Sequence, residues 1–128
     1  MAVVLDTSVA IHLRDGDVEV TRRVLGLKDS VFLAMATRIE LESGVYADPQ
    51  ETAVRLPRLR ALLEAIPVLP FNDAAADAYR AILASTGYSR RKILDRMIAA
   101  QALVHDATLI TLNPGDFRDI PALKLLAW

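Results

Sequence analysis

Apolar residues follow two patterns along this chain. Short runs of consecutive apolar residues are typical of strands buried on both faces, and longer stretches with apolar residues every three or four positions are typical of helices. The runs predict strands at residues 2–5, 31–34, 67–70, 108–112 and 123–127. The stretches predict helices at residues 8–14, 17–27, 37–46, 50–65, 73–86 and 95–105. This alternation predicts an α/β fold, with a central parallel sheet of four to five short strands and helices on both of its faces.

Local signals set several of the boundaries. Thr7 or Ser8 is expected to cap the first helix, and Asn72 and Gly87 are expected to begin and end the fifth. Pro57 lies within the fourth helical stretch, where it predicts a kink or the start of a new helix. No repeat or linker interrupts the pattern, so residues 1–128 are expected to form a single domain.

Composition narrows the chemistry that the chain can perform. Hydrophobic residues make up 53% of it and aromatic residues only 5%, so the core is expected to be aliphatic. The chain has no cysteine, which excludes disulfides, thiolate metal sites and cysteine nucleophiles. Its two histidines, His12 and His105, offer little for a zinc site or a histidine-based triad.

The first residues show no basic region followed by a long apolar run, and no apolar stretch approaches the roughly 18 residues of a membrane span. We therefore expect a cytoplasmic protein with no membrane partner.

Four acidic residues stand at predicted ends of strands or starts of helices. Asp6 follows the first strand, Asp116 follows a later strand and a turn, and Glu40 and Asp95 lie in the first turns of helices. Because the carboxyl ends of parallel strands meet at one edge of a sheet, we expect these carboxylates to lie together there. Such a cluster repels itself unless a cation neutralises it. The pattern therefore predicts a site for Mg²⁺ or Mn²⁺, which prefer oxygen ligands.

Each acid also has a purely structural interpretation. Asp6 and Asp95 are suitable helix N-caps, and Thr37 with Glu40 has the spacing of a capping box. Asp116 follows Asn-Pro-Gly and would stabilise its own turn. These interpretations remain open for each residue alone, and it is the combination of four acids that favours a metal site.

Four motifs carry a resemblance that runs nearly the length of the chain. They are VVLDTS at residues 3–8, ELxxG at 40–44, DxxIAAxA at 95–102 and TxNxxDF at 111–117. In this order and spacing they resemble the PIN-domain ribonucleases, and most closely the toxin component of bacterial VapBC-type toxin–antitoxin pairs. The resemblance implies a single PIN-like domain.

The resemblance also implies an activity: metal-dependent endonucleolytic cleavage of RNA that leaves a 5′ phosphate and a 3′ hydroxyl. The implied catalytic and metal-binding residues are Asp6, Glu40, Asp95 and Asp116, with Asp6 and Asp95 central. The implied supporting residues are Thr7, Ser8 and Asn113. One position departs from the family pattern, because Leu112 stands where many relatives have an arginine.

The expected partners are an RNA substrate, a cognate antitoxin and a second copy of the chain. Basic residues that would contact the RNA backbone are Arg14, Arg90, Arg91, Lys92 and Arg96, with Arg96 favoured because it adjoins Asp95. A solvated basic loop is the equal alternative for them, since net charge is only −1. The fourth helical stretch carries a stripe of apolar residues, Leu56, Leu59, Leu62, Leu63 and Ile66. This stripe is either ordinary core or part of a groove that binds an antitoxin helix or a second copy of the chain.

Other α/β functions fit less well. A receiver-type signalling domain needs an acidic pair after its first strand and a lysine near the end of a late one, but Asp6 stands alone and Thr111 occupies the lysine position. A phosphatase or dehalogenase would have a second Asp two residues after Asp6, where this chain has Ser8. A catalytically inactive PIN-like module that only binds a partner is the remaining alternative, and the four intact acids argue against it.

Overall fold

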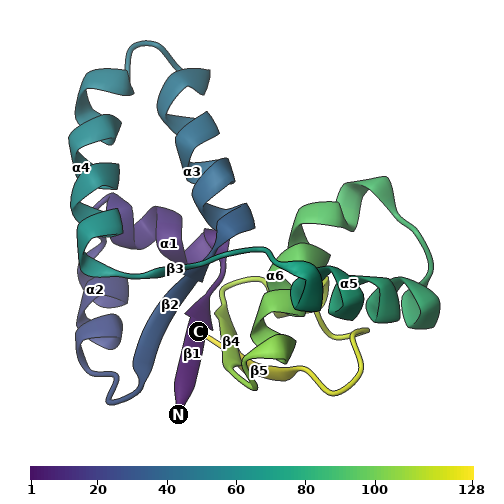
Figure 1. The fold of residues 1–128 in the computed structure, drawn as a ribbon. Helices are drawn as coiled ribbons and strands as arrows, with labels where there is room; N and C mark the ends of the chain where they lie inside the picture. Colours follow the sequence, from purple (N-terminus) through teal and green to yellow (C-terminus); the bar gives the residue numbers. More distant parts are fainter.

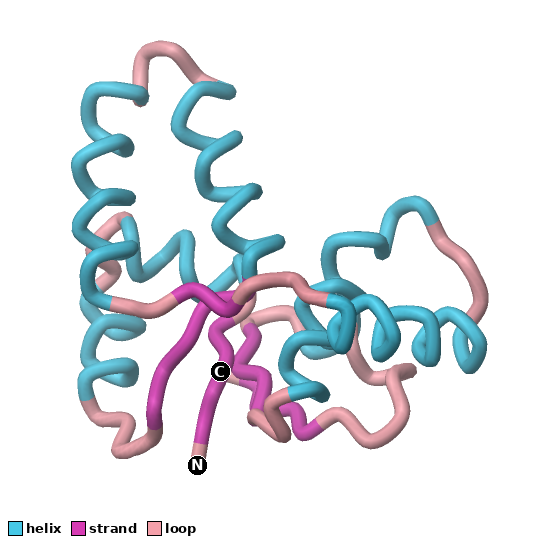
Figure 2. Tube along the Cα trace, viewed as in Figure 1, coloured by secondary structure: helices cyan, strands magenta, loops and turns pink.

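The computed structural model describes residues 1–128 as a parallel sheet between two layers of helices (Figures 1 and 2). The strands are β1 Ala2–Leu5, β2 Ser30–Ala34, β3 Val68–Leu69, β4 Thr108–Thr111 and β5 Lys124–Ala127. Their order across the sheet is β3-β2-β1-β4-β5, and every neighbouring pair is parallel. The predicted α/β class, with five strands and helices on both faces, is confirmed.

Six helices surround the sheet. They are α1 Thr7–Arg14, α2 Val18–Leu25, α3 Met35–Ala47, α4 Thr52–Ala65, α5 Asp73–Thr86 and α6 Ile93–Val104. Two single 3₁₀ turns, η1 Arg90–Lys92 and η2 Pro114–Asp116, follow α5 and β4. Helices α3 and α4 form an antiparallel pair that projects beyond the sheet, while α5 and α6 lie at its other side (Figure 1). None of the helices is long and apolar enough to cross a membrane.

The sheet separates two hydrophobic cores, because successive side chains of a strand point to opposite faces. Val4 and Leu109 face the core that α6 fills with Ile98. Val3 and Ile110 face the core that contains residues of α1, α3 and α4. Both faces of the central strands are therefore covered, which explains why these strands are continuously apolar.

Several helix ends follow the predicted signals. The Asn72 side chain accepts a hydrogen bond from the Ala75 N–H and caps α5. Gly87 ends the helix with a φ of 82°, in the left-handed region where glycine carries no steric penalty. Pro57 lies inside the single helix α4, so the alternative of a new helix starting there is wrong.

Helix α3 begins at Met35, two residues earlier than predicted, directly after β2. Its N-terminus has no local side-chain cap. Instead, the Met35 N–H donates a 3.0 Å hydrogen bond to Oε1 of Gln101, a residue of α6 that is only 1% exposed. Nε2 of Gln101 donates to the carbonyls of Leu69 (2.7 Å) and Pro70 (3.1 Å). One buried amide therefore joins α6, the start of α3 and the end of β3.

Candidate functional site

Asp6 is held firmly at the carboxyl end of β1. Its side chain is almost fully buried, and its Oδ1 accepts a 3.0 Å hydrogen bond from the Val9 N–H, so it does cap α1. The hydroxyls of Ser8 and Thr111 donate to Oδ1 and Oδ2 respectively. Asp6, and not Thr7 or Ser8 as expected, therefore caps α1, and a third donor from the end of β4 binds the same carboxylate.

Thr111 is a site residue that sequence reasoning missed. It ends β4, and its hydroxyl also accepts a 2.9 Å hydrogen bond from the Asn113 N–H. The Ser8 hydroxyl in turn accepts one of 3.1 Å from the Leu112 N–H. The ends of β1 and β4 are thus joined through the two hydroxyls that bind Asp6. Strand register is the signal that locates Thr111: Leu5 pairs with Ile110, so Asp6 and Thr111 lie side by side.

Glu40 faces the same edge from α3. Its Oε1 accepts a 2.8 Å hydrogen bond from the Thr7 hydroxyl, which also lies 3.1 Å from the hydroxyl of Thr37. Thr37 is buried within α3 rather than at its start, so the capping-box interpretation of Thr37 and Glu40 is wrong. Burial raises the pKa of Glu40, the Thr7 hydrogen bond opposes this, and the negative charge of Asp6 adds to the increase.

Asp95 lies in the first turn of α6 and does not cap it, since Lys92 occupies the cap position. Its pKa is raised to about 6, chiefly by burial and then by the negative charges of Asp116, Glu40 and Asp6, with Lys92 opposing. The same three acids that the motifs grouped with Asp95 are therefore close enough to affect its protonation. The negative charges of all three acids therefore act on Asp95.

Asp116 lies in η2 and lines a polar pocket with Asp95. The pocket measures about 290 Å³ and contains no hydrophobic side chain; its other lining residues are Ser89, Arg91 and Lys92. Asn113 makes no side-chain cap to the η2 turn. Its contribution here is the backbone bond to Thr111, so its expected supporting role involves the main chain.

The acids fit a hard divalent cation by their chemistry but do not form a ready-made site. All four supply carboxylate oxygens, and burial, followed by neighbouring negative charge, raises the pKa of Glu40 and Asp95. No three acidic or histidine side chains converge closely enough to hold a metal ion as they stand. Occupancy would therefore require side chains of the less constrained acids to turn toward Asp6.

The basic residues divide into two groups. Arg90 and Arg91 are exposed on η1, and Arg91 and Lys92 line the polar pocket. The side chain of Arg14 is only 4% exposed and pairs with Asp15 at 3.0 Å. That of Arg96 is 3% exposed; it pairs with Asp119 at 3.3 Å and also donates to the Gly87 carbonyl. The structure contradicts the prediction that Arg14 and Arg96 contact RNA, because neither guanidinium faces solvent.

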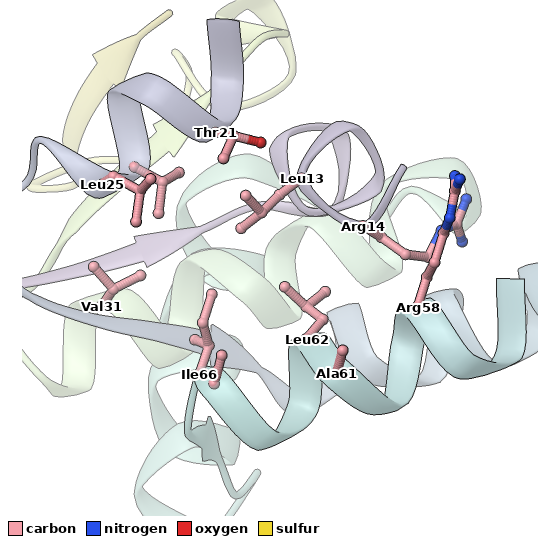
Figure 3. A pocket seen from close by; sticks show the side chains of 11 residues that line it. Leu13, Arg14, Thr21, Leu25, Val31, Arg58, Ala61, Leu62 and Ile66 are labelled. Atoms are coloured by element: carbon pink, nitrogen blue, oxygen red, sulfur yellow. The ribbon is translucent and has the colours of Figure 1, made fainter. Parts of the chain in front are cut away.

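A larger apolar groove lies away from the acids, between α1, α2, α4 and β2 (Figure 3). Its volume is about 470 Å³, and Leu13, Leu25 and Val31 face Leu62 and Ile66 across it. Arg14 and Arg58 stand at one end. The apolar stripe of α4 is chiefly core, since Leu59, Leu62 and Ile66 are all buried, but the last two also form one wall of this groove.

Comparison with known proteins finds VapC and VapBC proteins among those similar to this chain. Ribonuclease VapC from Rickettsia bellii (strain RML369-C) is 27% identical over 131 residues, covering 98% of this chain and 96% of that protein. A second similar protein is a chain in the crystal structure of VapBC2 from Rickettsia felis bound to a DNA fragment from their promoter. It superposes with a TM-score of 0.87 at 21% identity, which covers 100% of this chain and 99% of that chain. A chain in the structure of VapBC-1 from nontypeable Haemophilus influenzae superposes with a TM-score of 0.81 at 27% identity, which covers 100% of this chain and 98% of that chain.

The PIN domain family model matches residues 3–123. This span includes all four motifs and all four acids. The family that the motifs predicted is therefore confirmed: the chain belongs to the PIN-domain family.

Proposed function

We propose that this protein is a divalent-metal-dependent endoribonuclease that acts as the toxin of a toxin–antitoxin pair. The observation that carries the proposal concerns Asp95, which lines the polar pocket with Asp116 and whose pKa is raised by burial and then by the negative charges of Asp116, Glu40 and Asp6. The similarity to Ribonuclease VapC along nearly the full length of both chains supports it. A partner-binding module without activity would gain nothing from holding four repelling carboxylates together.

The four acids would hold Mg²⁺ or Mn²⁺, with Asp6 and Asp95 as the central ligands. When bound, such an ion supplies Lewis acidity toward a phosphodiester and lowers the pKa of coordinated water. The protein's own contribution is orientation. Ser8, Thr111 and the Val9 N–H fix the Asp6 carboxylate, and Thr7 fixes that of Glu40.

The polar pocket beside Asp95 and Asp116 gives the RNA backbone a place to bind. Arg91 and Lys92 line it together with these acids. A phosphate next to the scissile one would interact there with two cations, which offsets the repulsion between RNA and the acidic edge. Arg90, exposed on the same turn, would extend this contact.

Removal of divalent metal is expected to stop the reaction. Purified protein incubated with single-stranded RNA should cleave it in Mg²⁺ or Mn²⁺, leave 5′ phosphate and 3′ hydroxyl ends, and show no cleavage in EDTA. Excess Mn²⁺ added to the EDTA sample should restore activity, which controls for denaturation. Cleavage that persists in EDTA would refute the metal requirement, and the absence of cleavage in every metal would favour the inactive partner-binding module.

We propose the apolar groove as the binding site of the antitoxin. A groove of this size, walled by α1, α2 and α4, suits the apolar face of a helix. Arg58, which is exposed at one end of the groove, suits an acidic residue on that helix. Structural relatives that are VapBC complexes support the assignment of an antitoxin as the partner.

Ala61 provides a test of the groove, because it lines the groove and is exposed on α4. Ala61→Glu should weaken binding of a candidate antitoxin by about 10- to 100-fold, since the Glu side chain would project into the groove and lose its hydration when the helix binds. Isothermal titration calorimetry measures the change. Ala84→Glu, at an exposed position of α5 away from the groove, is the matched control and should bind normally.

We also propose that the isolated chain forms a homodimer, for which the same groove offers apolar contact area. Light scattering at high concentration tests this. A strict monomer would contradict the homodimer and leave the antitoxin assignment intact.

A further inference from the structure

Trp128 lies at the same edge of the sheet as the carboxylates. Strand β5 pairs with β4 so that Ala127 is opposite Thr111, and the Trp128 N–H donates a 2.9 Å hydrogen bond to the Thr111 carbonyl. Thr111 in turn neighbours Asp6 of the central strand. Since adjacent strands lie roughly 4.8 Å apart, the end of β5 is about 10 Å from the end of β1. The carboxyl ends of β1, β4 and β5 therefore form one row.

A small pocket opens at Trp128. It measures about 210 Å³, and its lining residues are Glu19, Val20, Arg23, Leu112 and Trp128. The indole and Leu112 are partly buried against the hydrophobic core, which fixes one side of the pocket. The guanidinium carbon of Arg23 lies 5.7 Å from the centroid of the indole ring. We refer to this as the Trp128 pocket.

Its lining restricts the chemistry of what can bind. An indole, an aliphatic side chain and a guanidinium together favour a flat, polarisable ring with polar edges, because both the indole and a guanidinium stack on such rings. A purely aliphatic ligand would cover the Arg23–Glu19 ion pair and would not gain the stacking that the indole and the guanidinium offer. Glu19 already pairs with Arg22 and Arg23, so these guanidiniums have less charge to offer a free phosphate. A nucleobase meets all of these conditions.

The pocket is also fixed relative to the acids. The Leu112 N–H donates to the Ser8 hydroxyl, and that hydroxyl donates to Asp6. Two hydrogen bonds therefore connect a lining residue of the Trp128 pocket to the central carboxylate. The pocket and the Asp6 carboxylate therefore lie along the same edge of the sheet.

We propose that the Trp128 pocket binds an unpaired nucleobase of the RNA substrate, one or two nucleotides from the scissile phosphate. This inference rests on the proposed ribonuclease function and adds a base-binding contact to it. A base within a duplex has both faces stacked and its edge paired, so it cannot enter the pocket. The pocket therefore distinguishes an unpaired base from a paired one.

The chain contains one tryptophan, so its fluorescence reports on this pocket alone. The probe is a short single-stranded RNA, titrated into the full-length Asp95→Asn protein in Mg²⁺ so that the RNA stays intact. We expect saturable quenching of indole emission. The same RNA annealed to its complement, or carrying abasic residues around the cleavage site, should bind more weakly and quench little. Equal quenching by the abasic RNA would overturn the proposal, because no base would then be stacking.

Variants of the active protein provide the second measurement. Trp128→Ala should lower kcat/KM for single-stranded RNA by about 5- to 150-fold, mostly through KM, while Trp128→Phe should retain most of the affinity because a phenyl ring still stacks. Tyr46→Ala, which removes an aromatic ring 64% exposed near the far end of α3, should change neither constant.

The outcomes separate the two proposals. RNA cleavage that is unchanged in Trp128→Ala, without quenching, would overturn the base pocket and leave the nuclease standing. Absence of both cleavage and quenching would overturn both. Loss of antitoxin affinity in Trp128→Ala with unchanged kcat/KM would make the pocket a protein contact and would also overturn the proposal.

Discussion

Replacing Asp95 by asparagine is expected to lower kcat/KM for metal-dependent RNA cleavage by at least about 100-fold. Asp95 is the acid on which Asp116, Glu40 and Asp6 all act, so it lies centrally among the proposed metal ligands. A neutral amide is a weaker ligand for Mg²⁺ or Mn²⁺ and leaves one negative charge fewer to hold the ion. Steady-state cleavage of a fluorescent single-stranded RNA measures the effect.

The same substitution should stabilise the metal-free protein at neutral pH. Because the folded-state pKa of Asp95 is about 6, above its ordinary 3.8, the folded state binds this proton more tightly than the unfolded state. Ionised Asp95 therefore destabilises the folded state. This loss of stability is absent below about pH 4, grows as pH rises toward 6 and is fully present above pH 6. Allowing for solvent screening, it is of the order of 1 kcal/mol, so Asp95→Asn should raise Tm by about 3–5 °C at pH 7.5 and by much less at pH 4.5.

The control is Glu42→Gln, which removes an exposed acid of α3. It should leave both the cleavage rate and the pH dependence of Tm unchanged. Mn²⁺ should raise the Tm of the wild-type protein and of this control more than that of Asp95→Asn. Normal cleavage by Asp95→Asn would remove Asp95 from the site, and an unchanged Tm at both pH values would show that Asp95 does not repel the other acids.

Replacing Gln101 by leucine is expected to lower the free energy of unfolding by about 2–4 kcal/mol. The change keeps the volume of the side chain but leaves the Met35 N–H and the Leu69 and Pro70 carbonyls without their partner. Buried polar groups that lose a hydrogen bond each cost about 1–3 kcal/mol, and Pro70 is exposed enough for water to compensate in part. Urea unfolding followed by circular dichroism measures the loss.

Gln101 also affects the site, because it connects α6, which carries Asp95, to the start of α3, which carries Glu40. Gln101→Leu should therefore weaken Mn²⁺ binding as well as the fold. Gln50→Leu, on the exposed loop after α3, is the matched control and should change the free energy of unfolding by less than about 0.5 kcal/mol. A loss as small as this in Gln101→Leu would show that the amide does not hold these segments together.

The features that the sequence predicted correctly depend on residues close together in the chain. Continuous apolar runs located the strands because strands buried on both faces need them, and Asn72 and Gly87 marked the ends of α5 because caps and left-handed residues act within one turn. Asp6 was identifiable because it directly follows a predicted central strand.

The features that the sequence did not predict depend on partners far along the chain. Thr111 meets Asp6 only because of the register between β1 and β4. The start of α3 moved to Met35 because a side chain of α6 replaces the local cap. Arg96 was expected on the surface, but Asp119 and the Gly87 carbonyl hold it inside. Local patterns carry no information about such long-range contacts.

Asp6 both caps α1 and accepts hydrogen bonds from two hydroxyls, so its substitution should affect the stability of the fold differently from substitution of Asp95. Loss of its side chain would remove both the α1 cap, worth about 1 kcal/mol, and the acceptor for two hydroxyls. Loss of Asp95 instead removes a carboxylate whose ionised form is disfavoured by burial and by the neighbouring acids. In gene copies that have lost activity, we therefore expect Asp95 to be substituted early and Asp6 to be retained longer. The sequences of inactive PIN-domain paralogues would show this difference.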